Sequence, residues 1–180
     1  GNASTTAEAV NNGSADNCGI ASLALDIADF TCANVGQNDV VLTVTDVNGN
    51  SSTANAVVTV VDEIDPTALA QNVTIYLDAD GNASTTAEAV DNGSTDNCGI
   101  QSLALDIEAF TCAHVGQNNV VLTVTDVNGN SSTANAVVTV VDDIDPTALA
   151  QNVTIYLDAD GNASTTAEAV NNGSADNCGI

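Results

Sequence analysis

Acidic residues gather in two hexapeptides whose spacing suits metal binding. Residues 61–66 read Val-Asp-Glu-Ile-Asp-Pro and residues 141–146 read Val-Asp-Asp-Ile-Asp-Pro, so each places three carboxylates directly before one of the two prolines. The chain has 24 acidic residues and neither lysine nor arginine, so no basic side chain is available to neutralise these groups. Ca²⁺ prefers carboxylate and amide oxygens, in sets of about six to eight. We therefore expect calcium at both hexapeptides.

The two hexapeptides recur because the whole sequence repeats with a period of 80 residues. Residues 1–80 and 81–160 differ at eight positions, and residues 161–180 match residues 1–20 at every position. We predict three modules: 1–66, which lacks its first strand; 67–146, which is complete; and 147–180, the first strands of a truncated third module. This phase predicts that the sequence is a window of a longer array, with the acidic hexapeptides as joints between modules.

Alternating apolar residues predict the strands that must position these acids. In the complete module, the segments with this pattern are 73–77, 83–90, 103–107, 110–115, 120–125 and 136–141. The pair Asn128-Gly129 predicts a hairpin with a primed turn, and no segment shows a helix start followed by a matching apolar face. About seven short strands per unit predict an all-β fold of tandem immunoglobulin-like antiparallel β-sandwich modules, arranged as beads on a string.

The order of these strands predicts which acidic loops meet. Strand 73–77 leaves the first joint, so the loops at 91–97 and 126–130 should return to it, whereas the loop at 78–82 should lie near the second joint. The candidate metal ligands are Asp62, Glu63, Asp65, Asp78, Asp80, Asp91, Asp96, Asp126, Asp142, Asp143 and Asp145. The alternative is that these residues only form turns and protect sheet edges.

The cysteines recur at the same two positions in each repeat, which predicts one disulfide per module. Cys18–Cys32 and Cys98–Cys112 each span 14 residues, and we expect the partner of Cys178 to lie beyond the chain end. Paired cysteines in small modules with few aromatic residues indicate an oxidising, extracellular compartment, where a thin core needs covalent support.

Three runs in the complete module carry a family resemblance: DNGSTDNCGI at 91–100, FTCAHVG at 110–116 and VVLTVTDVNGNSSTANAVVTVVD at 120–142. The unit resembles the hyalin-repeat-like, immunoglobulin-like tandem modules of secreted and cell-surface proteins from Bacteroidetes-type bacteria. The resemblance covers all 80 residues and implies extracellular stalks, adhesins and fibres rather than catalysis. Such modules often carry a second cysteine pair, whereas this chain has alanine at both places, which fits a lost disulfide. These alanines are Ala54, Ala70, Ala134 and Ala150.

Together these features favour a structural module of an extracellular or cell-surface fibre, filament or stalk with calcium-stiffened joints. Its partners would be further copies joined end to end, with lateral association between fibres. One alternative is an adhesive array that binds a glycan or a surface; another is a filament assembled by strand donation between subunits.

Several classes of function are disfavoured by composition. The formal charge of −24 excludes nucleic acid and anionic membranes as electrostatic partners. No stretch approaches 18 apolar residues, so we expect no membrane insertion. No nucleophile–base pair, phosphate loop or zinc ligand set is recognisable, so we do not expect an enzyme.

Overall fold

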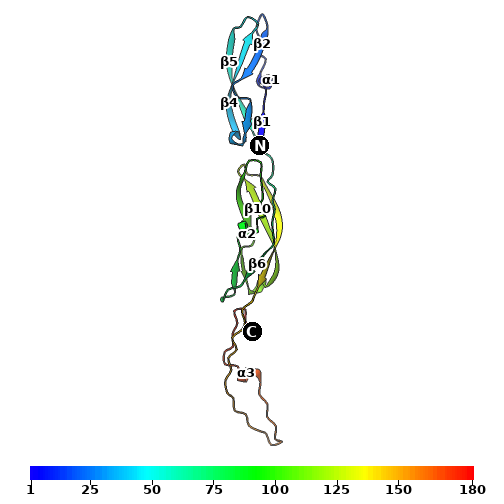
Figure 1. Cartoon of the computed structure of the whole chain (residues 1–180), viewed down its shortest axis with the longest axis vertical. Coiled ribbons are helices and arrows are strands. Elements are labelled where there is room, and N and C mark those ends of the chain that lie inside the picture. The colour runs from blue at the N-terminus through cyan, green and yellow to red at the C-terminus, as the bar shows by residue number, and fades with distance from the viewer. The chain divides into compact units, whose positions relative to one another are not determined.

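The computed structural model describes residues 1 to 180, and most of its regular elements are β-strands (Figure 1). Its contacts divide the chain into two compact units. One contains Gly1–Thr67, Thr95–Ser102 and Val124–Ser132, and the other contains Ala68–Ser94, Leu103–Thr123 and Thr133–Ile180. The first acidic hexapeptide therefore lies wholly inside the first unit, and the second lies wholly inside the second.

The first sequence copy forms two antiparallel sheets. One contains β2 (Ile20–Leu25), β4 (Gly36–Asp46) and β5 (Ser51–Val60); the other pairs β1 (Asn2–Ser4) with β3 (Asp29–Thr31). Short helices α1 (Ala7–Val10) and η1 (Cys32–Asn34) connect them.

The second copy repeats this arrangement and adds one strand. Its larger sheet has the order β6-β11-β10-β8, formed by Val73–Tyr76, Ser131–Val141, Gly116–Asp126 and Ile100–Leu105. Its smaller sheet pairs β7 (Asn82–Ser84) with β9 (Ala109–Thr111), which is followed by η2 (Cys112–His114). The predicted all-β fold with antiparallel sheets is confirmed, and the added strand β6 makes a parallel pair with β11.

Alternation along β10 and β11 builds the core of the second copy, as their sequence pattern predicts. Every second residue faces inward, and Phe110 on β9 completes the cluster at 1% exposure. The inward residues of the two long strands are Val120, Leu122, Val124, Ala136, Val138 and Val140.

The segment predicted as a strand over 83–90 is a strand only as far as Ser84. It continues as helix α2 (Ala87–Val90), whose N-cap is Thr86: its hydroxyl accepts a hydrogen bond from the Ala89 backbone N–H at 3.3 Å. Threonine is a favourable N-cap and Ala-Glu-Ala favours helix, so local capping outweighs the weak alternation there. The same helix recurs as α3 (Ala167–Val170) in a segment, 147–180, that contains no strand.

The predicted primed turn between β10 and β11 is also wrong. A type I′ turn needs positive φ at two residues, but only Gly129 has one, at 96°. The Asp126 backbone N–H donates to the Asn130 carbonyl, which leaves a three-residue loop whose last residue is the left-handed glycine. Three-residue loops of this kind are the common alternative to the two-residue hairpin.

Both disulfides differ from the predicted pairs. Cys32 bonds Cys98 and Cys112 bonds Cys178, each pair separated by 66 residues with Cα atoms 5.3 Å apart. The predicted bridges Cys18–Cys32 and Cys98–Cys112 are wrong, as is the prediction that Cys178 finds its partner beyond the chain end; Cys18 is exposed and unpaired. Strand β8 separates Cys98 from Cys112, and its six residues span about 20 Å. Bonded cysteines need Cα atoms within about 7 Å.

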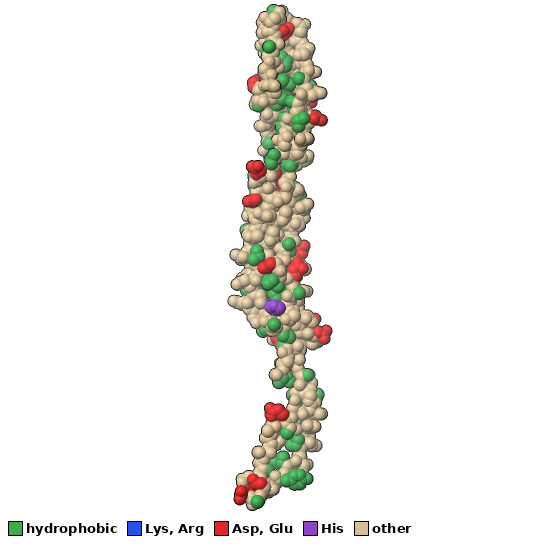
Figure 2. All heavy atoms as spheres, turned by 180° about the vertical axis from the view of Figure 1, so that it is seen from behind, with side chains coloured by type: hydrophobic (Ala, Val, Ile, Leu, Met, Phe, Trp, Pro, Cys, Tyr) green, Lys and Arg blue, Asp and Glu red, His purple; other side chains and the backbone are tan.

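Side-chain types on the visible surface follow the composition (Figure 2). Acidic side chains are scattered over it, and no lysine or arginine lies among them because the chain has none. None of the helices is long and apolar enough to cross a membrane.

Candidate metal centre

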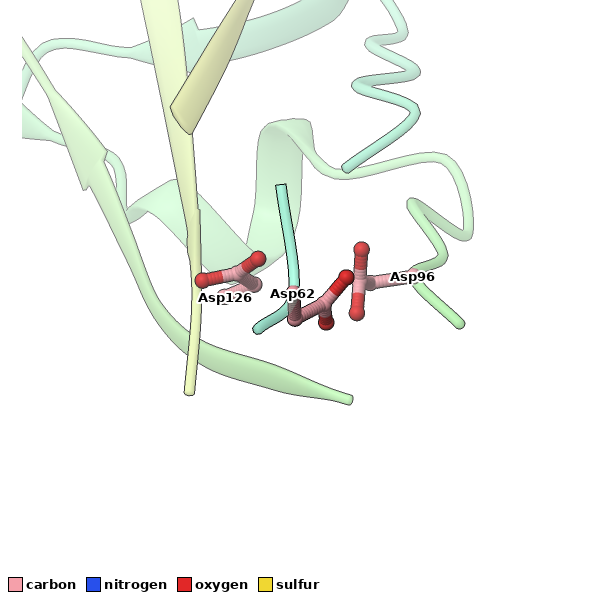
Figure 3. A group of neighbouring side chains, drawn as sticks. All are labelled: Asp62, Asp96 and Asp126. Atoms are coloured by element: carbon pink, nitrogen blue, oxygen red, sulfur yellow. The ribbon is translucent and has the colours of Figure 1, made fainter. Parts of the chain in front are cut away.

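Three carboxylates from distant parts of the sequence meet in the first compact unit (Figure 3). Asp62 follows β5, Asp96 precedes β8, and Asp126 is the last residue of β10. Each offers one oxygen, and these three oxygens lie within 4.8 Å of one another. The sequence predicted that these three loops would meet, and the structure brings these residues together.

Asp126 is the innermost member of the group, at 0% exposure. Its Oδ1 accepts hydrogen bonds from the backbone N–H groups of Asn128 and Asn130, both at 2.8 Å, and its Oδ2 accepts one from the Asn130 side-chain amide, also at 2.8 Å. Burial raises the pKa of Asp126, but these hydrogen bonds outweigh burial, so the pKa lies below its ordinary value. The hydrogen bonds therefore favour the charged form of this buried carboxylate.

Asp96 uses only one of its two oxygens. Its Oδ2 accepts hydrogen bonds from the backbone N–H groups of Cys98, at 2.7 Å, and Gly99, at 3.0 Å, which closes a tight turn before β8. Its Oδ1 is buried and has no hydrogen-bond partner. Buried polar atoms are normally paired, so this oxygen signals that a partner is missing.

Asp62 is held from both sides. Its carboxylate oxygens lie 3.3 and 3.4 Å from the side-chain amide of Asn97, and its backbone carbonyl accepts from the Asn130 side chain at 3.1 Å. Further along the linker, the carbonyl of Pro66 accepts from the Ser132 hydroxyl. The linker after β5 is therefore fixed against the turn after β10.

The donor set fits a hard divalent cation. Charged carboxylates this close repel one another, and the chain has no basic side chain to compensate them. The unpartnered Asp96 Oδ1 supplies a free oxygen, and the side-chain oxygen of Asn128 is also buried without a partner. Oxygen donors with no sulfur or imidazole among them suit Ca²⁺ or Mg²⁺ rather than zinc or copper.

The second compact unit contains part of the same arrangement. Asp142 accepts a hydrogen bond from the Asn177 side-chain amide at 3.1 Å, as Asp62 does from Asn97. Asp176 accepts from the Cys178 backbone N–H at 3.0 Å, and its Oδ1 is again buried without a partner. Asp142 and Asp176 correspond to Asp62 and Asp96 in the 80-residue repeat, and the position corresponding to Asp126 falls outside the sequence.

The remaining predicted ligands lie outside the group formed by Asp62, Asp96 and Asp126. The carboxylate of Asp91 accepts hydrogen bonds from Ser94 and from the Gly93 backbone, and the Ser94 hydroxyl in particular lowers the pKa of Asp91. The Asp78 carboxylate accepts from the backbone N–H groups of Asp80 and Asn82, which forms a turn. The Asp78 carbonyl accepts from the Asn177 side chain, which also donates to Asp142, so this loop lies near the second joint as predicted. Six predicted ligands are exposed and outside the three-carboxylate group: Glu63, Asp65, Asp78, Asp80, Asp143 and Asp145.

Sequence reasoning missed two contributors. Asn97 contacts Asp62, and Asp176 is the repeat counterpart of Asp96. The period of 80 could have identified Asp176. No local signal marks the role of Asn97, because it depends on side-chain direction.

Comparisons with known proteins do not assign this chain to a family. No family model matches it, and no curated protein matches it. Among solved structures, the extracellular cadherin domains 1–4 of protocadherin gamma B7 align over 75% of this chain and 45% of that one, with 12% identity and a TM-score of 0.37. The cis-dimer structure of domains EC3–6 of protocadherin gammaB7 aligns over 63% of this chain and 34% of that one, with 19% identity and a TM-score of 0.32. This chain thus spans less than half the length of either structure.

Proposed function

We propose that this chain is a structural segment of an extracellular tandem-repeat fibre or stalk in which Ca²⁺ clamps the joints between repeats. The observation that carries the proposal is the group formed by Asp62, Asp96 and Asp126, in which a buried oxygen of Asp96 has no partner. The two disulfides support an oxidising, extracellular setting. The repetition of nearly identical units suits an assembly in which successive interfaces are alike.

The bound ion would act as a clamp by joining three segments that come from different parts of the fold. Asp62 belongs to the linker, Asp96 to the turn before β8, and Asp126 to the hairpin after β10. A bound Ca²⁺ would neutralise the carboxylate repulsion and supply the missing partner of Asp96. The linker would then lose freedom to bend relative to the second copy, which is the property that a fibre or stalk needs.

Calcium titration of the oxidised protein tests this proposal. We expect Ca²⁺ to raise the melting temperature, by an amount equivalent to about 2.7 kcal/mol at a free concentration 100 times the Kd. Asp62→Asn should weaken binding at the first joint by about tenfold or more, because it removes one of three carboxylates. Asp65→Asn is the matched control, since Asp65 is exposed in the same linker and lies outside the group.

Calorimetric binding and small-angle scattering, each with Ca²⁺ and with EGTA, provide the two readouts. The proposal predicts a stiffer particle with calcium and a smaller effect in Asp62→Asn than in Asp65→Asn. If calcium changes neither the melting temperature nor the scattering, the acids act as solvated turns and the clamp is wrong.

A further inference from the structure

The Cys32–Cys98 disulfide and the three carboxylates join the same two sequence copies. Cys32 and Asp62 come from the first copy, and Cys98, Asp96 and Asp126 come from the second. All five residues lie in one compact unit. A covalent bond and a candidate metal centre therefore restrict the same joint.

The two features are also linked through the Asn97 side chain. The side-chain amide nitrogen of Asn97 lies 3.3 Å from the Cys98 sulfur and 3.3 Å from Asp62 Oδ1. The neighbouring Cys98 backbone N–H donates to Asp96 Oδ2, which leaves Oδ1 free. The tripeptide Asp96-Asn97-Cys98 thus carries a candidate ligand, a bridging amide and the disulfide sulfur in succession.

Cys18 shows what the disulfide contributes. Its backbone N–H donates to Asp16 Oδ2 at 2.7 Å, so the same turn forms around an unpaired cysteine. The turn is therefore encoded locally, and the disulfide is not needed to shape it. What the bond adds at Cys98 is the position of that turn relative to Asp62, which belongs to a distant segment.

We propose that the Cys32–Cys98 disulfide and cation binding at Asp62, Asp96 and Asp126 are thermodynamically coupled, each strengthening the other. The inference rests on the proposed cation site. With the disulfide formed, the three carboxylates are already confined, so less chain entropy is lost when a cation binds. Linkage is reciprocal, so the cation must protect the disulfide from reduction by the same factor. The joint then softens under reducing conditions and also when calcium is scarce.

Serine variants test the first direction. The Cys32→Ser/Cys98→Ser double variant should lower Ca²⁺ affinity at the first joint by about tenfold, within the usual range of coupling between sites. Cys112→Ser/Cys178→Ser is the matched control, because it removes the other disulfide and should leave this affinity unchanged. Isothermal titration calorimetry measures both, and circular dichroism checks that each variant keeps its strands.

A reduction titration of the unmodified protein tests the reciprocal direction and does not depend on how the variants fold. Dithiothreitol transfers two electrons and two protons to each disulfide and becomes a cyclic disulfide itself. We expect Ca²⁺ to make Cys32–Cys98 about tenfold harder to reduce than in EGTA, equivalent to about 30 mV for two electrons. Cys112–Cys178, where only two of the three carboxylate positions are present, should shift less.

Alkylation and mass spectrometry can read the two bonds separately because their flanking sequences differ. Cys32 is followed by Ala-Asn and Cys112 by Ala-His, and an Asp-specific protease replaces trypsin, which has no site here. Equal shifts at both bonds, or calcium binding with no shift at Cys32–Cys98, would overturn the coupling alone. Failure of the oxidised protein to bind calcium would overturn the proposed function as well.

Discussion

Val10 and Val90 end two copies of one identical ten-residue segment, yet Val90 is fully buried and Val10 only half-buried. In the second copy, the Gln71 backbone N–H donates to the Val90 carbonyl, and the Gln71 side chain donates to the Ala89 carbonyl. In the first copy the position corresponding to Gln71 falls before residue 1, so Val10 has no such contact. Identical residues thus reach different burial because the segment before them, residues 67–77, covers the second copy.

The acidic positions show the same difference. Asp46 and Asp126 have the same place in the repeat and the same hydrogen bonds to their hairpins. Asp126 is nevertheless fully buried and Asp46 only partly, because the linker that carries Asp62 lies beside Asp126. The comparison teaches that the linker and first strand before the second copy complete it, because they cover its core and supply Asp62 to the candidate metal centre.

The largest expected effect is one that the two copies share. Phe30 and Phe110 are both buried, at 2% and 1% exposure, so covering residues are not needed to bury this ring. Phe30→Ala and Phe110→Ala should each destabilise their own copy by about 3–5 kcal/mol. Hydrogen exchange with mass spectrometry can assign the loss to β4 or β10. A much smaller cost for Phe30→Ala would mean that the first copy lacks a core of its own.

A smaller destabilisation, caused by replacing a core valine, should differ between the two copies. Val138 is at 0% exposure and β6 pairs with it through Val73, whereas its counterpart Val58 is half-buried and has no such neighbour. Val138→Ala should cost about 2 kcal/mol, because it removes fully buried methyl groups, and Val58→Ala should cost about half as much or less. Urea unfolding followed by circular dichroism measures both. Equal costs would show that the covering strand adds no stability at this position.

The smallest effect is electrostatic and concerns Asp46 and Asp126. A hydrogen bond from the Asn50 side chain is the main cause that lowers the pKa of Asp46; the pKa of Asp126 is lowered although burial opposes it. A lowered folded-state pKa means that each carboxylate stabilises the fold above about pH 3.9, and that this contribution is lost as pH falls through the lowered value.

Melting curves of calcium-depleted protein in calcium-free buffers between about pH 2 and pH 6 can check this sign. Asp46→Asn should lower the melting temperature at pH 6, and its difference from the unmodified protein should shrink as pH falls. Asp126→Asn should behave in the same way but with a smaller difference, because it also relieves repulsion from Asp62 and Asp96. Asp39→Asn serves as a surface control, because Asp39 is exposed and the second copy already has Asn119 there. Differences that stay constant with pH would show that the charge of these two carboxylates does not stabilise the fold.

The sequence by itself determined the repeat, the long strands and the general position of the acids. Alternation of apolar residues is a local property that a strand of the sheet must show, so β10, β11 and the all-β fold could be predicted. The predicted strand order also brought Asp62, Asp96 and Asp126 to one joint, because successive antiparallel strands return their loops to the same end.

Only the tertiary structure decided the disulfide partners, the burial of Asp126 and the covering of Val90. The spacing of 14 between neighbouring cysteines made a local bridge look natural, but β8 carries Cys98 and Cys112 apart, and each bonds a cysteine 66 residues away. These outcomes depend on which distant segments meet at one end of a sheet. A local pattern carries no information about which distant segments a residue will contact. Here two near-identical sequence copies contact different distant segments.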